Sequence, residues 1–334
     1  MTLAPRSVPG SAPAPAVYLP PLRSPVRTIG ERTFDFRTQI AVMAVVNRTP
    51  DSFYDRGATF ALDAAVRACL DAADAGADWV DIGGAPFAPG PELPVGEELD
   101  RVLPVVAAVR ERSDVVISVD TFRPEVARRC IQAGANVVND TTGLQDPQIV
   151  RVVADSDATL VITHSLARPR TFYPRPHYDD VAAEIAAFLR ERVEYAVSLG
   201  VPESRIVIDP GHDLNKNTLQ SLELTRRLAE IAALGLPTLA AVSNKDFIGE
   251  TLNAPRGDRL EGSLAAAVFA ILQGARIVRI HNVAESVAAV RMTEAILGFR
   301  APAYLKHNMG EINTVESDTV ETDTVRINTV ESDD

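Results

Sequence analysis

The stretch "DAGADWVDIGG" (74–84) contains a complete change of local structure. Gly76 is placed to end a helix, because helices commonly terminate at a residue in the left-handed conformation that glycine adopts without strain. The apolar residues Trp79, Val80 and Ile82 then predict a strand buried on both faces. The stretch therefore predicts a junction in which a helix ends, a buried strand follows and a glycine-containing loop begins.

The same junction recurs along the chain. Each time, a helix-like stretch ends at a glycine, a β-branched apolar run follows, and a polar cluster comes next. Further examples are "QAGANVVNDTTG" (132–143), "SLGVPESRIVIDPGHD" (198–213) and "QGARIVRIHNV" (273–283), in which Gly134, Gly200 and Gly274 are the expected helix ends. Runs without polar alternation are typical of a parallel sheet. In all, strands are expected at 39–46, 78–82, 115–120, 136–140, 158–164, 205–209, 238–243 and 276–281.

Amphipathic stretches separate these strands and predict helices. They include 61–75, 97–112, 181–199, 259–273 and 284–297. Eight strand–helix units within roughly 260 residues are typical of an α/β protein with a closed (β/α)8 TIM barrel. Their regularity favours closure over the alternative, an open doubly wound sheet. Residues 16–36 precede the first strand, and a hairpin that closes the amino-terminal end of the barrel is one arrangement they allow.

The two ends of the chain differ in composition from the barrel, which we assign to residues 38–300. Residues 1–37 begin with a Pro/Ala/Ser-rich leader that lacks the continuous apolar stretch of a signal peptide, so a disordered leader is expected. Residues 301–334 carry an acidic tail with "INTVESD" at 312–318 and again at 327–333. We expect this tail to be disordered and solvated as well.

Composition also limits the class of protein. The formal net charge of −12 argues against nucleic acid and anionic membrane as partners. No apolar run approaches the roughly 20 residues of a membrane span. The only two cysteines, Cys69 and Cys130, lie far apart in helix-like contexts, so buried reduced thiols are expected rather than a disulfide framework. Together these features predict a cytoplasmic protein.

Polar residues stand where the predicted strands end. In a barrel of this kind, the carboxyl-terminal ends of the strands form the active face. One polar residue at such a position is equally well explained as a helix cap or a core hydrogen bond. A polar residue at every strand end points instead to a single cleft. In order, the residues are Asn47, Asp81, Asp120, Asn139 with Asp140, His164, Asp209, Ser243 with Lys245, and Arg279 with His281.

These residues combine both signs of charge. Carboxylate and amide oxygens accept hydrogen bonds, so Asp120, Asn139 and Asp209 suit a flat heterocycle with ring N–H groups. Lys245 suits a carbonyl of the same heterocycle. This set of side chains therefore predicts a site for a polar, planar ligand.

The last strand carries charge at inward positions. Arg279 and His281 are two residues apart, point the same way, and suit phosphate oxygens. The alternative is an ordinary strand with a satisfied histidine. The chain shows no structural-zinc spacing, dinucleotide fingerprint or phosphate-cradling P-loop.

Several motifs, in this order, resemble the dihydropteroate synthase family, and the resemblance covers most of residues 40–297. The most specific is "VVNRTPDSFYDRG" (45–57), which looks like the family's first loop. The later motifs are "ISVDT" (117–121), "VVNDTTG" (137–143), "IDPGHDLNKN" (208–217), "VSNKDFIGE" (242–250), "EGS" (261–263) and "RIHNV" (279–283).

The resemblance implies a reaction that joins 6-hydroxymethyl-7,8-dihydropterin diphosphate to p-aminobenzoate and releases diphosphate. The C–O bond breaks early, and the aryl amine attacks the resulting pterin-methyl cation. The family also implies a homodimer through the last helices, here "AESVAAVRMTEAILG" (284–298). By position, the resemblance assigns pterin binding to Asp120, Asn139, Asp209 and Lys245, further substrate binding to Ser243, Arg279 and His281, catalytic roles to Asn47, Lys245, Arg279 and His281, and Mg2+ to Asn47.

The chain departs from the family at three places. "DIGGAPFAPG" (81–90) keeps the glycines and the Pro-Gly of the family's Gly-Gly-Glu-Ser-Thr-Arg-Pro-Gly but loses its hydroxyls and its arginine. Asn244 replaces the arginine of Ser-Arg-Lys. "HDLN" (212–215) replaces a small, glycine-rich segment, in which His212 and Asp213 form either a new acid–base pair or, with Asp213 alone, a helix cap.

Loss of one donor that stabilises the transition state costs about 3–4 kcal/mol of activation free energy, so two missing cations predict a reaction that is weakened or lost. Arg48, Arg56 and Arg123 lie near the same face, and each is read equally well as a replacement cation or a surface charge. Two alternatives remain: a pterin- or phosphate-binding protein without catalysis, and a related barrel that carries methyl groups from a folate. The "NRTPDSF" loop (47–53) argues against the second.

Overall fold

The computed structural model describes residues 19–47, 57–85, 89–173 and 175–307, without the side chains of 47 and 57–61. Contacts group the described residues up to Arg300 into one compact unit and place those from Ala301 onward in a second. Most of the leader and tail lies outside the described residues. The domain limits 1–37, 38–300 and 301–334 therefore stay predictions.

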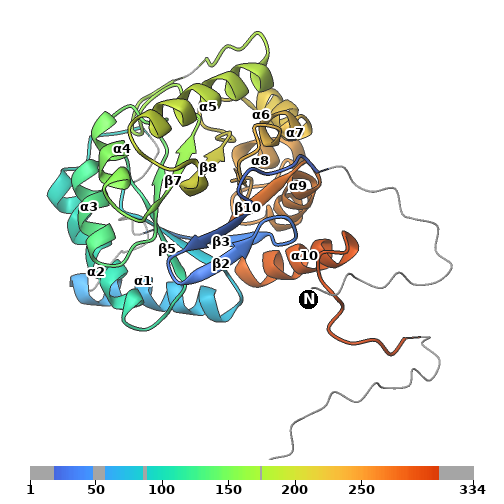
Figure 1. The fold of residues 1–334 in the computed structure, drawn as a ribbon, viewed down its shortest axis with the longest axis horizontal. Helices are drawn as coiled ribbons and strands as arrows, with labels where there is room; N and C mark the ends of the chain where they lie inside the picture. Colours follow the sequence, from blue (N-terminus) through green and yellow to red (C-terminus); the bar gives the residue numbers. More distant parts are fainter. Residues whose placement is uncertain (1–18, 48–56, 86–88, 174, 308–334) are drawn as a thin grey trace, which may run out of the picture. The chain divides into compact units, whose positions relative to one another are not determined.

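Eight parallel strands close into a barrel, which confirms the predicted fold class (Figure 1). The ring closes where β10 (Ala275–Ile280) pairs with β3 (Ala41–Asn47). The other strands follow in chain order: β4 (Trp79–Gly83), β5 (Val116–Asp120), β6 (Val137–Asp140), β7 (Thr159–Thr163), β8 (Ile206–Asp209) and β9 (Thr238–Ala240).

Helices surround the barrel (Figure 1). They are α1 (Gly57–Asp74), α2 (Val95–Arg110), α3 (Pro124–Gln132), α4 (Pro147–Ala154), α5 (Val181–Ser198), the 3-10 turn η2 (Glu203–Arg205), α6 (Thr218–Arg226), α7 (Leu228–Ala232), α8 (Asp246–Leu252), α9 (Leu260–Leu272) and α10 (Val283–Ile296). Within the described part of the chain, none of them is both long and apolar enough to cross a membrane.

The four predicted helix-ending glycines have positive φ, which confirms that reading of the sequence. Gly76, Gly134, Gly200 and Gly274 have φ of 96°, 106°, 100° and 105°, and each lies two residues beyond the end of a helix. At Gly134 a side chain would also lack space, because a Cβ atom would lie 2.7 Å from Arg110 Cγ. The glycines thus end α1, α3, α5 and α9 and turn the chain toward the next strand.

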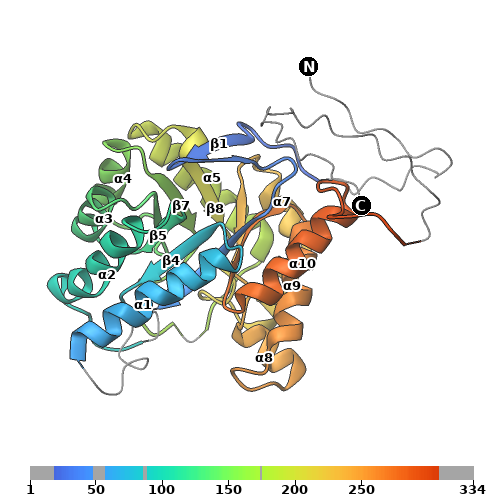
Figure 2. The same ribbon diagram turned by 90° about the horizontal axis from the view of Figure 1, so that it is seen from below.

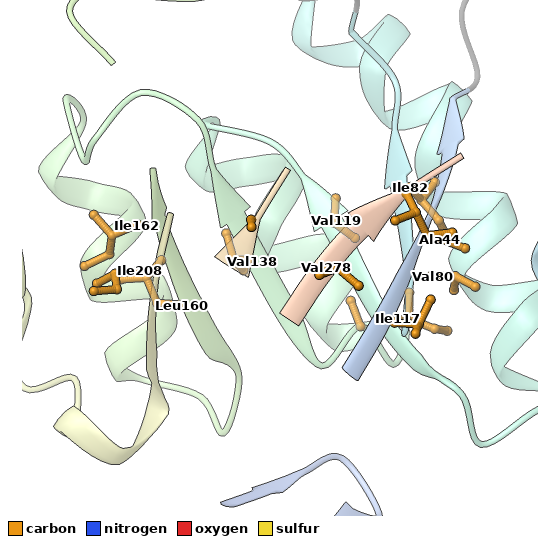
Figure 3. Packing of buried hydrophobic residues seen from close by; sticks show 14 of the residues in the cluster. Ala44, Val80, Ile82, Ile117, Val119, Val138, Leu160, Ile162, Ile208 and Val278 are labelled. Carbon is orange, nitrogen blue, oxygen red and sulfur yellow. The ribbon is translucent and has the colours of Figure 1, made fainter. Parts of the chain in front are cut away.

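Outward-facing strand residues form an apolar layer under the helices. Figure 3 shows part of this layer, including Val80, Ile117 and Val138. Cys69 and Cys130 belong to the same layer as free, fully buried thiols, as the sequence predicted. Burial raises the pKa of both thiols to about 12, so they stay protonated.

Inward-facing residues near the amino-terminal ends of the strands form a second apolar cluster. A hairpin of β1 (Val26–Ile29) and β2 (Arg32–Asp35) covers it, with Phe34 contacting Phe36 at 5.7 Å and Trp79 at 6.1 Å between ring centres. We call this cluster the barrel floor. It consists of Ile29, Phe34, Phe36, Ala41, Met43, Trp79, Val116, Val137, Val161, Val207, Leu239, Ala241 and Ile277. Figure 2 shows β1 and α8 at opposite ends of the barrel.

Candidate active site

Toward the carboxyl-terminal ends of the strands, the inward-facing positions become polar. On β4, Trp79 of the floor is followed two residues later by Asp81, and on β5 Val116 is followed by Ser118 and Asp120. Side chains two residues apart on a strand face the same side, so these polar groups lie in the barrel interior above the floor. The structure describes the side chains of all the predicted site residues except Asn47. They are Asp120, Asn139, Asp209, Ser243, Lys245, Arg279 and His281.

Arg279 lies between two carboxylates. Its Nε donates to Asp81 Oδ2 at 2.6 Å, and its Nη2 donates to Asp120 Oδ2 at 3.1 Å. Ser118 Oγ donates to Asp81 Oδ1 at 2.6 Å, and Asn139 Nδ2 donates to Asp81 Oδ2 at 3.3 Å. Asp81 has no exposed surface, and a buried carboxylate needs such partners. Asp81 therefore fixes the position of the arginine, and Asn139 shares the network.

The carboxyl groups of this cluster hold protons more tightly than usual. Burial, reinforced by the nearby charge of Asp81, raises the pKa of Asp120 to about 7, although Arg279 opposes the shift. Burial also raises the pKa of Asp209, whose Oδ1 accepts from Gly211 N at 2.7 Å. A ligand that donates hydrogen bonds to both oxygens of one of these carboxyl groups would favour its ionised form.

His281 is neutral at physiological pH. Burial, together with the charges of Arg279 and Lys245, lowers the pKa of His281 to about 4. Its Nδ1 lies 3.2 Å from Ser243 Oγ, in hydrogen-bonding contact. Burial also lowers the pKa of Lys245, with Asp213 opposing the shift. The imidazole therefore offers hydrogen bonds to an anion but no positive charge.

A pocket of about 530 Å³ opens beside the cluster. Ser243, Lys245, Arg279 and His281 line it, so four of the predicted residues share one cavity. Asp120 instead borders a small cavity of about 30 Å³. Arg279 links the two spaces, because it lines the larger one and contacts the carboxylate of Asp120.

The loop after β8 contains the third departure from the family. Asp213 and Asn215 have φ of 63° and 52°, a conformation that Asp and Asn tolerate better than most residues other than glycine. Asp213 Oδ2 accepts from the backbone N–H of Asp246 at 2.6 Å, the first residue of α8. Asp213 therefore caps α8. His212 is fully buried, and within the described residues its ring nitrogens have no hydrogen-bond partner, which rules out a His212–Asp213 pair in this conformation.

Two residues that the sequence placed at the cleft have structural roles instead. His164 Nδ1 lies 3.0 Å from Lys216 Nζ, and the imidazole packs edge-on against Phe188 of α5 at 4.8 Å between ring centres. Asp140 Oδ1 accepts from both the N–H and the hydroxyl of Thr142, at 2.6 and 2.7 Å. These contacts hold the turns after β6 and β7, although Asp140 Oδ2 is buried without a hydrogen-bond partner among the described residues.

The Ser243–Lys245 segment lies beyond its strand, because β9 ends at Ala240, three residues earlier than predicted. Arg259 holds the segment: its Nη1 donates to the carbonyl oxygens of Asn244 and Lys245 at 3.1 and 3.0 Å. Asn244 has φ of 57°, and its Oδ1 is buried without a hydrogen-bond partner among the described residues. The segment presents Lys245 to the pocket but adds no second cation at position 244.

Several predictions fall on undescribed residues. Arg48, Arg56, positions 86–88 and the side chain of Asn47 lie outside the described residues. Arg123 is described and is only 9% exposed, with its Nη1 3.2 Å from Glu98 Oε2 and its Nη2 3.4 Å from Glu92 Oε1. Arg123, one of the three arginines that could replace the missing cations, therefore already has anionic partners.

The predicted Mg2+ depends on Asn47. Elsewhere in the described part of the chain, no group of three or more His, Cys, Asp or Glu residues could hold a metal ion. Asp81 and Asp120, the carboxylates nearest the cluster centre, are paired with Arg279. The described residues thus do not form a metal site by themselves.

The sequence placed Asp81 at the cleft without a specific role, and it missed Arg259. Asp81 stood out because it is a charged residue in an apolar strand and shares the inward parity of Trp79. Arg259 had no such signal: it precedes α9, and its contacts with Asn244 and Lys245 come from the folding of two loops against each other.

Comparison with known proteins identifies the family. A family model described as "Pterin binding enzyme" matches residues 43–281. The dihydropteroate synthase of Escherichia coli K12 is 40% identical over 257 residues, covering 77% of this chain and 91% of that protein. A Mycobacterium leprae protein named "Inactive dihydropteroate synthase 2" is 42% identical over 271 residues, covering 78% of this chain and 92% of its own.

Solved structures show the same similarity. Dihydropteroate synthase from Xanthomonas albilineans with 4-aminobenzoic acid superposes with a TM-score of 0.76 at 38% identity, covering 82% of this chain and 98% of that one. The same enzyme in complex with 7,8-dihydropteroate gives 0.74 at 38% identity, covering 81% and 98%. The similar proteins thus include a synthase that binds these compounds and a protein named as inactive.

Proposed function

Because the chain belongs to the dihydropteroate synthase family of pterin-binding enzymes, we propose that its barrel rim binds 6-hydroxymethyl-7,8-dihydropterin diphosphate. We further propose that it joins this compound to p-aminobenzoate only weakly or not at all. The proposal keeps the family's ligand and separates binding from catalysis, because the two depend on different parts of the site.

Pterin binding is supported by the side chains that survive at the rim. Asp120, Asn139 and Asp209 supply oxygens for ring N–H groups, and Lys245 supplies a donor for the ring carbonyl. Arg279 joins Asp120 to the Asp81–Asn139 pair through hydrogen bonds, so these residues form one connected cluster. A preformed cluster loses little side-chain entropy when the ligand binds, which favours affinity.

Charge balance in the cluster carries the argument for weak catalysis. Arg279 is paired with Asp81 and Asp120, Asp209 lies near the charges of Lys245, Arg279 and Lys216, and His281 is neutral. In the family's reaction, the C–O electron pair leaves with diphosphate, the amine nitrogen forms the new C–N bond, and the amine loses a proton. Because the cations of the cluster are shared among its carboxyl groups, the cluster stabilises a pterin-methyl cation better than the departing anion.

The missing family cations further reduce the positive charge available to the departing diphosphate. Asn244 adds no charge, and Arg123 is already paired with two glutamates. The loop at 81–90 has lost its arginine as well. Mg2+, held by Asn47 together with diphosphate oxygens, would neutralise part of the leaving group, because protein-bound Mg2+ often has only one or two protein ligands.

A second candidate is a pterin-binding protein without catalysis that acts outside folate synthesis. The similarity to the Mycobacterium leprae protein named as inactive favours it, since that match covers as much of the chain as the match to the Escherichia coli synthase. The two candidates share the ligand and differ in turnover.

Calorimetry with the pterin diphosphate, followed by an assay for dihydropteroate, tests both candidates. We expect binding with little or no product. Product formation at the rate of an ordinary synthase would contradict the impairment, and failure to bind the pterin would contradict the family ligand.

A repaired variant tests the cause of the impairment. The changes Pro86→Ser, Phe87→Thr, Ala88→Arg and Asn244→Arg, made together, should raise product formation if missing donors and cations are the defect. Two to three decades of rate are expected for each donor that is recovered. No gain at all would show that the pocket serves another reaction.

We also infer that the chain forms a homodimer through its last helices. Met292 and Ile296 are 61% and 72% exposed and lie four residues apart on one face of α10, and Phe269 of the neighbouring α9 is 41% exposed. Analytical ultracentrifugation of the wild type and of Ile296→Asp tests this inference, and a monomeric wild type would contradict it.

A further inference from the structure

Arg256 lies at the mouth of the 530 Å³ pocket, in the turn between α8 and α9. It lines the same pocket as Lys245 and Arg279. Its side chain is 78% exposed, and it forms a loose ion pair, with Nη2 3.5 Å from Oδ2 of an exposed Asp246. Exposed ion pairs of this kind contribute little to stability, so an anion in the pocket can displace Asp246 at low cost.

Other arginines near this end of the barrel are held more firmly. Arg279 bridges Asp81 and Asp120 with 17% of its side chain exposed. Arg259, 10% exposed, donates to Asp246 at 2.9 Å and to two backbone carbonyls. Arg256 is therefore the described arginine of this pocket that can turn toward a ligand without breaking a buried ion pair.

The backbone around Arg256 leaves room for that movement. Gly257 has φ of 102°, and, apart from its two chain neighbours, no described residue has an atom within 4 Å of the place where its Cβ would be. Asn253, at the start of the turn, has φ of 52° and ends α8. Arg256 is thus carried by a turn with open space at Gly257.

The shape of the aryl substrate determines which anion reaches this place. In p-aminobenzoate, the amine and the carboxylate occupy opposite ends of the ring. When the amine faces the pterin inside the barrel, the carboxylate must point outward, toward the mouth. Pro89 and Leu214 line the same pocket and supply apolar surface for the ring between the two ends.

We propose that Arg256 binds the outward-facing carboxylate of the aryl amine, in place of the cations that the chain lacks at position 244 and in the loop at 81–90. This inference rests on the proposed pterin site. Arginine suits the task, because its planar fork donates two parallel hydrogen bonds to a carboxylate. Through this contact, Arg256 selects aryl amines that carry an acid group.

Equilibrium binding of 7,8-dihydropteroate and of its carboxamide analogue to the full chain tests the proposal without turnover. The two probes share the pterin and the ring and differ only in the charge at the outer end. The wild type should prefer the acid about tenfold, and Arg256→Ala should reduce the preference to about one, since tenfold is a typical value for a charge-assisted contact of about 1.4 kcal/mol. Arg256→Lys should retain part of the preference.

Arg37→Ala is the matched control, because Arg37 is also an exposed arginine paired with an exposed aspartate but lies next to the hairpin at the other end of the barrel. It should leave the acid-to-amide ratio unchanged. An unchanged ratio in Arg256→Ala, or a wild type that binds both probes equally, would overturn the proposal. A wild type that binds neither the probes nor 6-hydroxymethyl-7,8-dihydropterin would overturn the proposed function as well.

Discussion

At the floor of the barrel, Trp79 packs edge-on against Phe34; two residues further along the same strand, Asp81 holds Arg279 at the rim. Floor and rim are built from the same inward-facing rows of the same strands. Val116 and Asp120 on β5, like Val207 and Asp209 on β8, repeat the change from apolar to polar. The interior of this barrel is therefore apolar near the amino-terminal ends of the strands and polar near their carboxyl-terminal ends.

The two ends use burial in opposite ways. At the floor, burial removes apolar surface from water and stabilises the fold. At the rim, burial raises the pKa of Asp120 and lowers the pKa of His281, so both side chains favour their neutral forms. Burial also strengthens their interactions with neighbouring charges. A change at the floor should therefore alter stability without altering ligand binding, although one strand contributes to both.

The largest effect is expected at the floor, from Trp79→Ala. Trp79 has no exposed surface, and removing a buried aromatic ring typically lowers the free energy of unfolding by about 3–5 kcal/mol. Chemical denaturation measures the loss, and calorimetry on the folded fraction should give an unchanged affinity for the pterin diphosphate. Leu219→Ala, at a residue that is 76% exposed, is the control and should change stability by less than about 0.5 kcal/mol. A folded Trp79→Ala protein with much weaker binding would show that floor and rim are coupled.

A smaller loss of stability, accompanied by weaker binding, is expected at the rim from Asp81→Asn. The change removes the charge that Arg279 Nε contacts at 2.6 Å, while Asp120 remains as a partner. We expect unfolding to become easier by about 2–3 kcal/mol and pterin affinity to fall, because Arg279 and Asn139 lose their common anchor. Ser118→Ala removes a single donor to Asp81 and should cost only about 1 kcal/mol. Full pterin affinity in Asp81→Asn would mean that Asp81 does not position the cluster.

The smallest effect is a pH dependence confined to the rim. Because the pKa of Asp120 is raised to about 7, its carboxyl gains a proton as the pH falls through 7, and the protonated form cannot accept from two ring N–H groups. The affinity for 6-hydroxymethyl-7,8-dihydropterin should be full above pH 7 and fall by up to about tenfold per pH unit below it. Asp120→Asn should bind more weakly and lose this dependence. If the slope survives in Asp120→Asn, another group is responsible for it.

Much of the fold could be predicted because its signals are local. Glycines after helices and unbroken β-branched runs specify each helix–strand junction without reference to the rest of the chain. The strand that was predicted too long, 238–243, shows the limit of such signals. Ser243 directly follows an apolar run, yet β9 ends at Ala240, and the segment that follows is held by Arg259.

The sequence predicted which polar side chains gather at the strand ends, but not which partners they contact. This local pattern led us to expect Asp120, Asn139, Asp209 and Arg279 at one end of the barrel. It could not show that Arg279 would be bound by Asp81, or that His164 would turn to Lys216. The choice between a His212–Asp213 pair and a helix cap also depended on α8, which supplies the N–H that Asp213 accepts.

The order of helices, strands and polar strand ends was determined by the sequence alone, because spacing and residue type act over a few residues. The tertiary structure decided which charges meet. In the strand ladder Arg279 lies beside Met43, and Met43 beside Trp79, at the level of the floor. Its long side chain nevertheless reaches Asp81 and Asp120 nearer the rim. That contact depends on the closure of the barrel, because closure places β10, the last barrel strand, beside β3, the first barrel strand.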